Sequence, residues 1–239
     1  MTITALLTGK GNNTLRDKNI LRVRGQPLLY YPAMAARRCP QIGRYYVSSD
    51  GPAILDAAAA LGYERILRPP ELCRPESRHV DAITHALDTM RARDGHEPDI
   101  LVVLLANNIS IKTAWIETAL DRILAAPTLS AVVPVYEDQD HHPYRAKRLG
   151  PDGTVQPFLD LAGDVSTNRQ DLPPCYYLCH NFWALNLHHS VRHGTGAPPW
   201  SFMGPRVSPL VVEETVDVHL ARDLLLCEDW LERNGVRYD

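Results

Sequence analysis

The sequence predicts an α/β fold, a three-layer α/β/α sandwich, from two observations. Short apolar runs alternate with helix-like segments through the first half of the chain, and such β-α alternation indicates a sheet covered by helices. The run "ILVVLL" (Ile100–Leu105) is apolar throughout, as strands are when helices cover both faces of a parallel sheet. With 239 residues, 45% of them hydrophobic, the chain can bury a sizeable core in one large domain or two small ones.

The elements of the first half follow one another without a repeat or a linker. Short, mostly apolar runs mark most of the expected strands, and the expected helices show helical patterns. The predicted strands cover residues 3–8, 44–49, 64–68, 100–105 and 130–136. The predicted helices cover residues 27–39, 52–61, 80–92 and 114–125.

The pattern changes after Tyr136. The stretch "EDQDHHPYRAKRL" is polar and aromatic, and "GPDG" (150–153) stands between "YRAKRL" and "VQPFLDL", which predicts a hairpin. We expect a strand at "NFWALNL" and a last helix over 219–234. The sequence therefore predicts one domain, residues 1–239, that contains a β-rich insertion at residues 137–175.

Composition narrows the class of protein. The net charge of −3 argues against a protein built to coat nucleic acid, whereas a small anionic ligand needs only a local cluster of positive groups. No apolar stretch reaches transmembrane length, and the first residues do not form a signal peptide. The cysteines are odd in number and irregularly spaced, which favours a reduced, cytoplasmic protein. They are Cys39, Cys73, Cys175, Cys179 and Cys227.

The stretch "LLTGKGNNTLRDKN" (6–19) joins the end of the first strand to a loop rich in glycine and positive charge. Ligands of open α/β sheets bind beyond the carboxyl ends of the strands. Glycines let backbone N–H groups approach phosphate oxygens, and Lys10, Arg16 and Lys18 can neutralise them. The loop lacks the third glycine of the dinucleotide fingerprint and the ending of the P-loop. By itself it fits a phosphate site or a solvated surface turn equally well.

Further stretches, in order along the chain, resemble those of one family. "LRDKNILRVRGQPLLYYPAMAA" is similar to the family's Lys-Asn-x-x-x-x-x-Gly-x-Pro-Leu segment, and "YYVSSDG" to its "VSTDD" strand end. "LRPPELCRPESRHVDAITHAL" is similar to "RPxELAxDxSxxxDVVxHAL", and "HHPYRAKRLGPDGTVQPF" and "NRQDLPPCYYL" to its middle segment. The chain therefore resembles the acylneuraminate cytidylyltransferases (CMP-sialic acid synthetases), as a divergent member.

The resemblance implies a Rossmann-like, GT-A-like nucleotidyltransferase fold whose β-rich insertion forms a homodimer. It implies that CTP and Mg²⁺ bind at the sheet edge, that a sugar hydroxyl attacks the α-phosphate, and that pyrophosphate leaves. The implied catalytic residues are Lys10, Arg16 and Lys18. The implied CTP-binding residues are Thr8, Gly9, Gly11, Asn12, Asn13, Lys18, Asn19, Arg68 and Ser77. The implied acceptor-binding residues are Ala106, Asn107, Asn108, Lys147, Arg169 and Asn181, and the implied metal ligands are Asp217 and His219.

Four positions depart from the family pattern. Gly9 and Asn13 stand where the family's loop "ARGGSKGxxxKN" has arginine and lysine. Ala106 replaces the glutamine of "LLQPTSPLR", which reads "LLANNISIK" here. His219 replaces the second aspartate of an Asp-x-Asp metal site, although Mg²⁺ prefers oxygen ligands. Either Asp217 works with phosphates and waters alone, or a further carboxylate, Asp223 or Asp50, assists it.

Several of these residues also fit a purely structural role instead of ligand binding. Arg68 before Pro69 also fits an ordinary surface arginine, Arg169 fits an interface ion pair, and Asp217 fits a helix N-terminal charge. Cys175, Cys179 and His180 follow no common zinc spacing.

The sequence thus predicts a CTP-dependent cytidylyltransferase that acts on an acidic sugar. The alternatives are CTP activation of a non-sugar acid such as a phosphonate, a non-catalytic binding homologue, and a dinucleotide-binding oxidoreductase. The incomplete glycine pattern disfavours the oxidoreductase.

Overall fold

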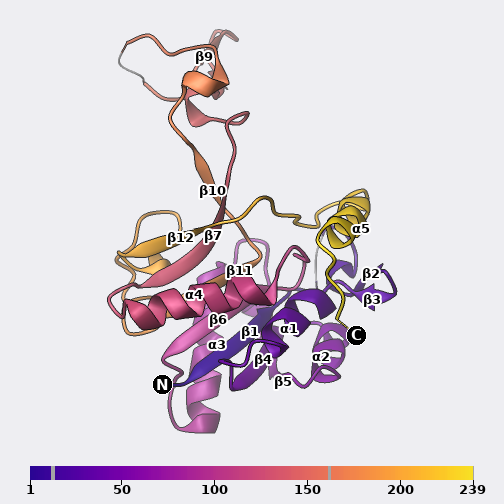
Figure 1. Cartoon of the computed structure of the whole chain (residues 1–239). Coiled ribbons are helices and arrows are strands. Elements are labelled where there is room, and N and C mark those ends of the chain that lie inside the picture. The colour runs from indigo at the N-terminus through magenta and orange to yellow at the C-terminus, as the bar shows by residue number, and fades with distance from the viewer. Residues whose placement is uncertain (12–13, 161–162, 239) are drawn as a thin grey trace.

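The computed structural model describes residues 1–11, 14–160 and 163–238. Within these residues the protein forms an eight-stranded sheet in which β11, β6, β1, β4 and β5 follow β7 in that order (Figure 1). β11 and the short β10 share one edge of β7, and β12 lies along its other edge. The strands are β1 (Ile3–Thr8), β4 (Arg44–Ser49), β5 (Glu64–Leu67), β6 (Ile100–Leu105), β7 (Ala131–Glu137), β10 (Tyr176–Leu178), β11 (Phe182–Asn186) and β12 (Val207–Val211).

The sheet is mostly parallel. β1 pairs in parallel with β4 and β6, and β5 pairs in parallel with β4, whereas β11 runs antiparallel between β6 and β7. The carboxyl ends of β1, β4, β5 and β6 therefore lie at one edge of the sheet, where ligands of such sheets bind.

Helices cover both faces of the sheet. Leu7 of β1 shares a buried core with Leu29, Ile54 and Ile116, on the side of α1, α2 and α4. Its neighbour Leu6 faces the other way and packs with residues of α3, since successive side chains of a strand point to opposite faces. The predicted three-layer α/β/α sandwich is confirmed. The helices are α1 (Tyr30–Arg37), α2 (Pro52–Ala59), α3 (His79–Asp94), α4 (Thr113–Ala125) and α5 (Asp223–Arg233).

Two predicted helices begin later than the sequence indicates, each for a local reason. Instead of opening a helix at residue 27, the chain pairs β2 (Arg22–Val23) with β3 (Gln26–Pro27). The two-residue turn between them places Arg24 at φ 48° and Gly25 at φ 80°, as a tight hairpin turn requires. α5 begins at Asp223 and not at residue 219. The Asp223 carboxylate accepts the backbone N–H groups of His219 and Leu220, which holds these two residues in a loop before the helix.

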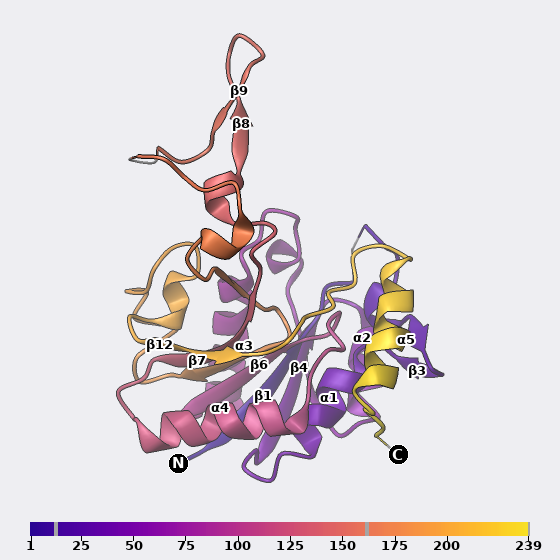
Figure 2. The same ribbon diagram turned by 45° about the horizontal axis from the view of Figure 1, so that its top comes forward.

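The insertion forms an arm that projects from the sheet (Figure 2). It leaves through β7, returns through β10, and carries the antiparallel pair β8 (Lys147–Leu149) and β9 (Val155–Pro157), so the predicted hairpin is confirmed. Several of its apolar side chains face solvent: Leu149 is 79% exposed and Phe158 is 60% exposed. Such an apolar surface is typical of a segment that packs against another protein surface.

β12 was not predicted from the sequence. Pro209 stands in its middle, and its pairing partner β7 lies far away along the chain. The five cysteines are free thiols, and all but Cys175 are buried. Among the described helices, none combines the length and apolar character needed to span a membrane.

Candidate functional site

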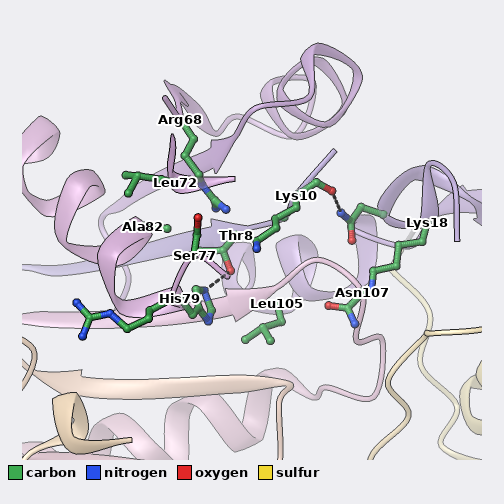
Figure 3. A pocket seen from close by; sticks show the side chains of 13 residues that line it. Thr8, Lys10, Lys18, Arg68, Leu72, Ser77, His79, Ala82, Leu105 and Asn107 are labelled. Atoms are coloured by element: carbon green, nitrogen blue, oxygen red, sulfur yellow. Dashed lines mark hydrogen bonds between the residues drawn. The ribbon is translucent and has the colours of Figure 1, made fainter. Parts of the chain in front are cut away.

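A cavity of about 200 Å³ opens at the sheet edge where the carboxyl ends of β1 and β6 meet the N-terminus of α3 (Figure 3). Its walls come from three segments that are distant along the chain: the opening loop, the stretch that leads from β5 into α3, and the end of β6. The lining residues are Thr8, Gly9, Lys10, Lys18, Asn19, Arg68, Leu72, Ser77, Arg78, His79, Ala82, Leu105 and Asn107.

Two lysines stand at one end of this cavity. Lys10 Nζ donates to the carbonyl of Arg74 at 2.8 Å, and Lys18 Nζ donates to the carbonyl of Val218 at 3.2 Å. Burial lowers the pKa of Lys18, and the neighbouring Asp217 opposes that shift. The same two lysines also line a second, adjoining cavity of about 530 Å³ that reaches His219. An elongated anion that passes between the two cavities would therefore meet both ammonium groups.

The opening loop is held by the side chain of its last residue, Asn19, and by that of Asp50 from outside the loop. The buried Asn19 donates from Nδ2 to the Lys10 carbonyl at 2.8 Å, and Asp50 accepts the Gly11 N–H at 2.7 Å. A Cβ atom on Gly9 would lie 3.0 Å from Asn19 Nδ2 and 3.1 Å from Ala106 Cβ. This crowding explains why glycine stands at position 9: a larger side chain would displace the amide that shapes the loop.

Arg68 is a buried residue of the cavity, with 3% of its surface exposed, and is not the surface arginine of the structural alternative. Its Nε donates to Ser48 Oγ at 3.2 Å and its Nη2 to the Ser48 carbonyl at 2.8 Å. Burial lowers its pKa. Ser77 Oγ donates to the Glu71 carbonyl at 2.8 Å, which closes the turn between β5 and α3.

Asp217 lies near Lys18. It forms an isolated antiparallel β-bridge with Asn108, which follows β6. Its Oδ1 accepts from Asn107 Nδ2 at 3.0 Å and from Asn108 Nδ2 at 3.3 Å, and its Oδ2 is 3.8 Å from His219 Nε2. Burial raises the pKa of the Asp217 carboxyl, and His180, His219 and Lys18 act against that rise. Asp217 precedes α5 by several residues, so it is not the helix N-terminal charge of the structural alternative.

The structure does not gather a set of protein metal ligands around Asp217. Across residues 1–11, 14–160 and 163–238, no three His, Cys, Asp or Glu side chains lie together in a way that could hold a metal ion. The two carboxylates considered as helpers have other partners, because Asp223 accepts the backbone N–H groups of His219 and Leu220, and Asp50 accepts that of Gly11 in the opening loop. A Mg²⁺ ion here would depend on Asp217, waters and the phosphates of a ligand, an arrangement that Mg²⁺ commonly adopts.

The predicted acceptor residues are dispersed. Asn107 lines the cavity, whereas Ala106, Asn108 and Asn181 are fully buried. The Asn181 amide bonds to the Ser110 carbonyl and to its neighbour's N–H, so both of its polar atoms have structural partners. Lys147 and Arg169 lie on the arm and do not line either cavity. Their role stays a prediction that requires the arm of a second copy.

Some predicted loop residues are not placed at the cavity. Arg16 is almost fully exposed and pairs with Asp17 at 3.4 Å, and it does not line either cavity. Asn12 and Asn13 lie outside the described residues, and Gly11 contributes its N–H to Asp50.

Comparison with known proteins identifies the family. The sequence model of the cytidylyltransferase family matches residues 11–141, more than half of the chain. The chain belongs to this family. The match begins within the opening loop and includes Lys18, Asn19, Arg68 and Ser77, and it ends shortly after β7. The prediction of a divergent cytidylyltransferase is confirmed.

The curated relatives of the chain include N-acylneuraminate cytidylyltransferases of Streptococcus agalactiae, serotypes V and III. Both are 25% identical to the chain over 171 residues, which cover 70% of this chain and 39% of each relative. The matched part of the chain thus spans about two fifths of the length of these relatives.

Solved structures share the fold. A CMP:2-keto-3-deoxy-manno-octonic acid synthetase complexed with CTP superposes with a TM-score of 0.70 at 14% identity, covering 98% of this chain and 100% of that one. The 4-diphosphocytidyl-2C-methyl-D-erythritol synthase of Anaerococcus prevotii has a TM-score of 0.65 at 13% identity, with coverages of 97% and 99%. These likenesses show that the chain shares the α/β fold of the two structures, as the sequence predicts.

Sequence reasoning missed several walls of the cavity. Leu72, Ala82 and Leu105 form apolar parts of it, and His79 contributes an imidazole (Figure 3). Leu72 belongs to a matched motif, but no pattern marks it as a cavity residue. His79 is the first residue of α3. Only a correctly predicted start of this helix, shortly after Ser77, could have indicated from the sequence that His79 lines the cavity.

Proposed function

We propose that this protein is a CTP-dependent cytidylyltransferase that transfers CMP to a small anionic acceptor, an acidic sugar, and releases pyrophosphate. One observation carries the proposal: a single cavity collects seven of the predicted nucleotide-site and catalytic residues from separate segments of the chain. They are Thr8, Gly9, Lys10, Lys18, Asn19, Arg68 and Ser77. Family membership supports cytidine as the nucleoside.

The proposed chemistry fits the charges of the site. A hydroxyl oxygen of the acceptor forms a bond to the α-phosphorus of CTP and loses its proton, while the bond from that phosphorus to the pyrophosphate oxygen breaks. Negative charge then accumulates on the phosphates, and Lys10 and Lys18 face the space that they would occupy. Fixed cations of this kind stabilise the transition state because they need no reorganisation during the reaction. Asn19 and Arg68, which are both buried, give the nucleotide rigid walls.

Asp217 is the residue that would hold Mg²⁺ against the triphosphate. Its carboxylate is fixed by two asparagine amides through Oδ1, which leaves Oδ2 as the oxygen nearer His219. A bound Mg²⁺ would neutralise phosphate charge and orient the leaving pyrophosphate. The neighbouring Lys18 would then act on the same phosphates from the protein side, because the charges of Lys18 and Asp217 influence each other.

CTP is expected to raise the melting temperature of the protein in the presence of Mg²⁺. A ligand that binds only the folded state stabilises it, by about 2.7 kcal/mol at a hundred times its Kd. Differential scanning fluorimetry with CTP, UTP, ATP and NAD at equal concentration measures this effect. Equal or greater stabilisation by ATP or NAD would contradict the assignment of the nucleotide and revive the oxidoreductase alternative.

The acceptor is expected not to be N-acetylneuraminic acid. Ala106 offers no amide, and the amides of Asn108 and Asn181 bond to the protein itself. A site that lacks the polar partners of a ligand discriminates against it by about 1–3 kcal/mol for each unpaired group. Pyrophosphate release with CTP should therefore be faster with another acid than with N-acetylneuraminate. The panel comprises other nonulosonic acids, 3-deoxy-octulosonate and small phosphonates, and N-acetylneuraminate as the best substrate would refute this prediction.

The arm is expected to form a homodimer. Leu149, Val155 and Phe158 are each at least 60% exposed on a segment that projects from the sheet. Replacing Leu149 and Phe158 by serine should convert a dimer to a monomer in sedimentation velocity at micromolar concentration, while leaving the CTP-dependent rise in melting temperature in place. Exposed Leu67 on β5 offers a matched control, because Leu67→Ser changes an apolar surface residue outside the arm. A wild-type protein that sediments only as a monomer would exclude this homodimer.

A further inference from the structure

His79 stands in the wall of the cavity at the start of α3 and bonds to the end of β1. Its Nε2 lies 3.0 Å from Thr8 Oγ1 (Figure 3). Its ring is 5.3 Å from the ring of the buried Trp183. The ring is thus held on two sides, by a hydrogen bond and by an aromatic neighbour, and its orientation toward the cavity is fixed.

The Thr8 hydroxyl decides which ring nitrogen carries the hydrogen. Thr8 Oγ1 lies 3.1 Å from the carbonyl oxygen of Leu104, which can only accept, so the single hydroxyl hydrogen points to Leu104. Thr8 Oγ1 must then accept from His79, which places the ring hydrogen on Nε2. The other nitrogen, Nδ1, carries a lone pair and acts as an acceptor.

The ring also stays neutral. Burial, together with the charges of Arg68, His180 and Lys10, lowers the pKa of His79 to about 3. A second proton is therefore not added to Nδ1 near neutral pH, and Nδ1 remains an acceptor when a nucleotide arrives. Among the described residues, no hydrogen bond to Nδ1 accompanies the one at Nε2.

The rest of the cavity presents mainly hydrogen-bond donors. Lys10, Lys18 and Arg68 are cations, and the Asn19 amide is turned so that its nitrogen donates to the Lys10 carbonyl. These groups suit phosphate and carbonyl oxygens. An imidazole acceptor suits the opposite partner, a neutral N–H or O–H group, and the nucleoside half of CTP offers two kinds: the 4-amino group of cytosine and the ribose hydroxyls.

We propose that His79 is a specificity-determining residue whose Nδ1 accepts a hydrogen bond from a neutral N–H or O–H donor of the nucleoside. This inference rests on the proposed function and extends it to a residue-level rule of nucleotide choice. UTP has a carbonyl oxygen where CTP has the amino group, so an acceptor at that point would repel it. A deoxynucleotide lacks the corresponding hydroxyl.

The test compares wild type with His79→Phe, which keeps a flat ring against Trp183 and removes the acceptor. Isothermal titration with Mg²⁺ and CTP, UTP, 2′-deoxy-CTP or 3′-deoxy-CTP gives each Kd. We expect His79→Phe to bind CTP about tenfold or more weakly, the loss for one buried hydrogen bond. It should bind the analogue that lacks the recognised group with unchanged affinity. Loss of discrimination against UTP identifies the amino group, and loss of discrimination against a deoxynucleotide identifies that hydroxyl.

Two further variants keep the test decisive if His79→Phe folds poorly. His79→Gln restores an acceptor oxygen and should recover part of the discrimination. Thr8→Val removes the group that fixes the ring hydrogen and should reduce discrimination, whereas its matched control Thr8→Ser should not. Unchanged discrimination in His79→Phe would overturn the inference while CTP-selective binding by wild type still supports the function. If wild type does not prefer CTP, the proposed function and the inference both fall.

Discussion

Replacing Asp217 with asparagine is expected to lower kcat by about a hundredfold or more, because fixed charge and metal at a phosphoryl centre contribute on that scale. The change keeps the shape of the side chain and an oxygen that can still accept from Asn107 and Asn108. The measurement is pyrophosphate release with CTP and the best acceptor, as a function of Mg²⁺ concentration. A near-normal rate at low Mg²⁺ would remove Asp217 from the mechanism.

The Asp217→Asn protein is expected to remain folded. Burial raises the pKa of this carboxyl above its ordinary value, so its ionised form is less favoured in the folded protein than in the unfolded chain. At pH values above both the unfolded and the folded pKa, the ionised Asp217 carboxylate therefore does not stabilise the folded protein. Removing its charge should not lower the melting temperature near pH 7. If the melting temperature of Asp217→Asn fell by a large amount, its lower kcat would reflect unfolding and would not show a loss of metal binding.

His219→Asp is the companion to that experiment. His219 Nε2 lies 3.8 Å from Asp217 Oδ2, and His219 is mostly exposed, so an aspartate at this position can be solvated. A second carboxylate supplies the oxygen ligand that Mg²⁺ prefers. The apparent affinity of His219→Asp for Mg²⁺ should therefore be higher than that of wild type. Asp217→Asn, alone or combined with His219→Asp, should bind Mg²⁺ more weakly than wild type.

Replacing Lys18 with methionine is expected to lower kcat/KM for CTP by about a hundredfold or more. Methionine has a similar length and removes the ammonium that faces both cavities. A preorganised cation at a developing phosphate charge is worth about that factor. Steady-state rates over a range of CTP concentrations separate a loss of binding, seen in KM, from a loss in the transition state, seen in kcat.

Lys18→Arg and Lys10→Met are the controls for this variant. Arginine retains the charge, so Lys18→Arg should keep more activity than Lys18→Met. It should also extend activity to higher pH, because burial lowers the pKa of Lys18 and rising pH removes its proton before that of an ordinary lysine. Lys10 lines the same two cavities. Equal activity of Lys18→Met and wild type would show that the phosphates do not pass between the lysines.

The sequence by itself determined the layers of the fold and the location of the site. Apolar runs such as Ile100–Leu105 specify buried parallel strands, and the carboxyl ends of such strands meet at one edge. A glycine- and lysine-rich loop after the first strand is thereby placed at that edge. The motifs around Lys18 and Arg68 could be found because short local patterns carry them, and the cavity brings both together.

Only the tertiary structure decided how the residues of the site act, because their contacts join segments far apart in the chain. The neutrality and orientation of His79 depend on Thr8 and Trp183, and the environment of Asp217 depends on Asn107 and Lys18. The sequence predicted the hairpin of the insertion but not that it projects from the sheet and carries Lys147 and Arg169 away from the cavity. Burial, hydrogen-bond partners and the resulting pKa shifts arise from packing, and no local pattern of residues encodes them.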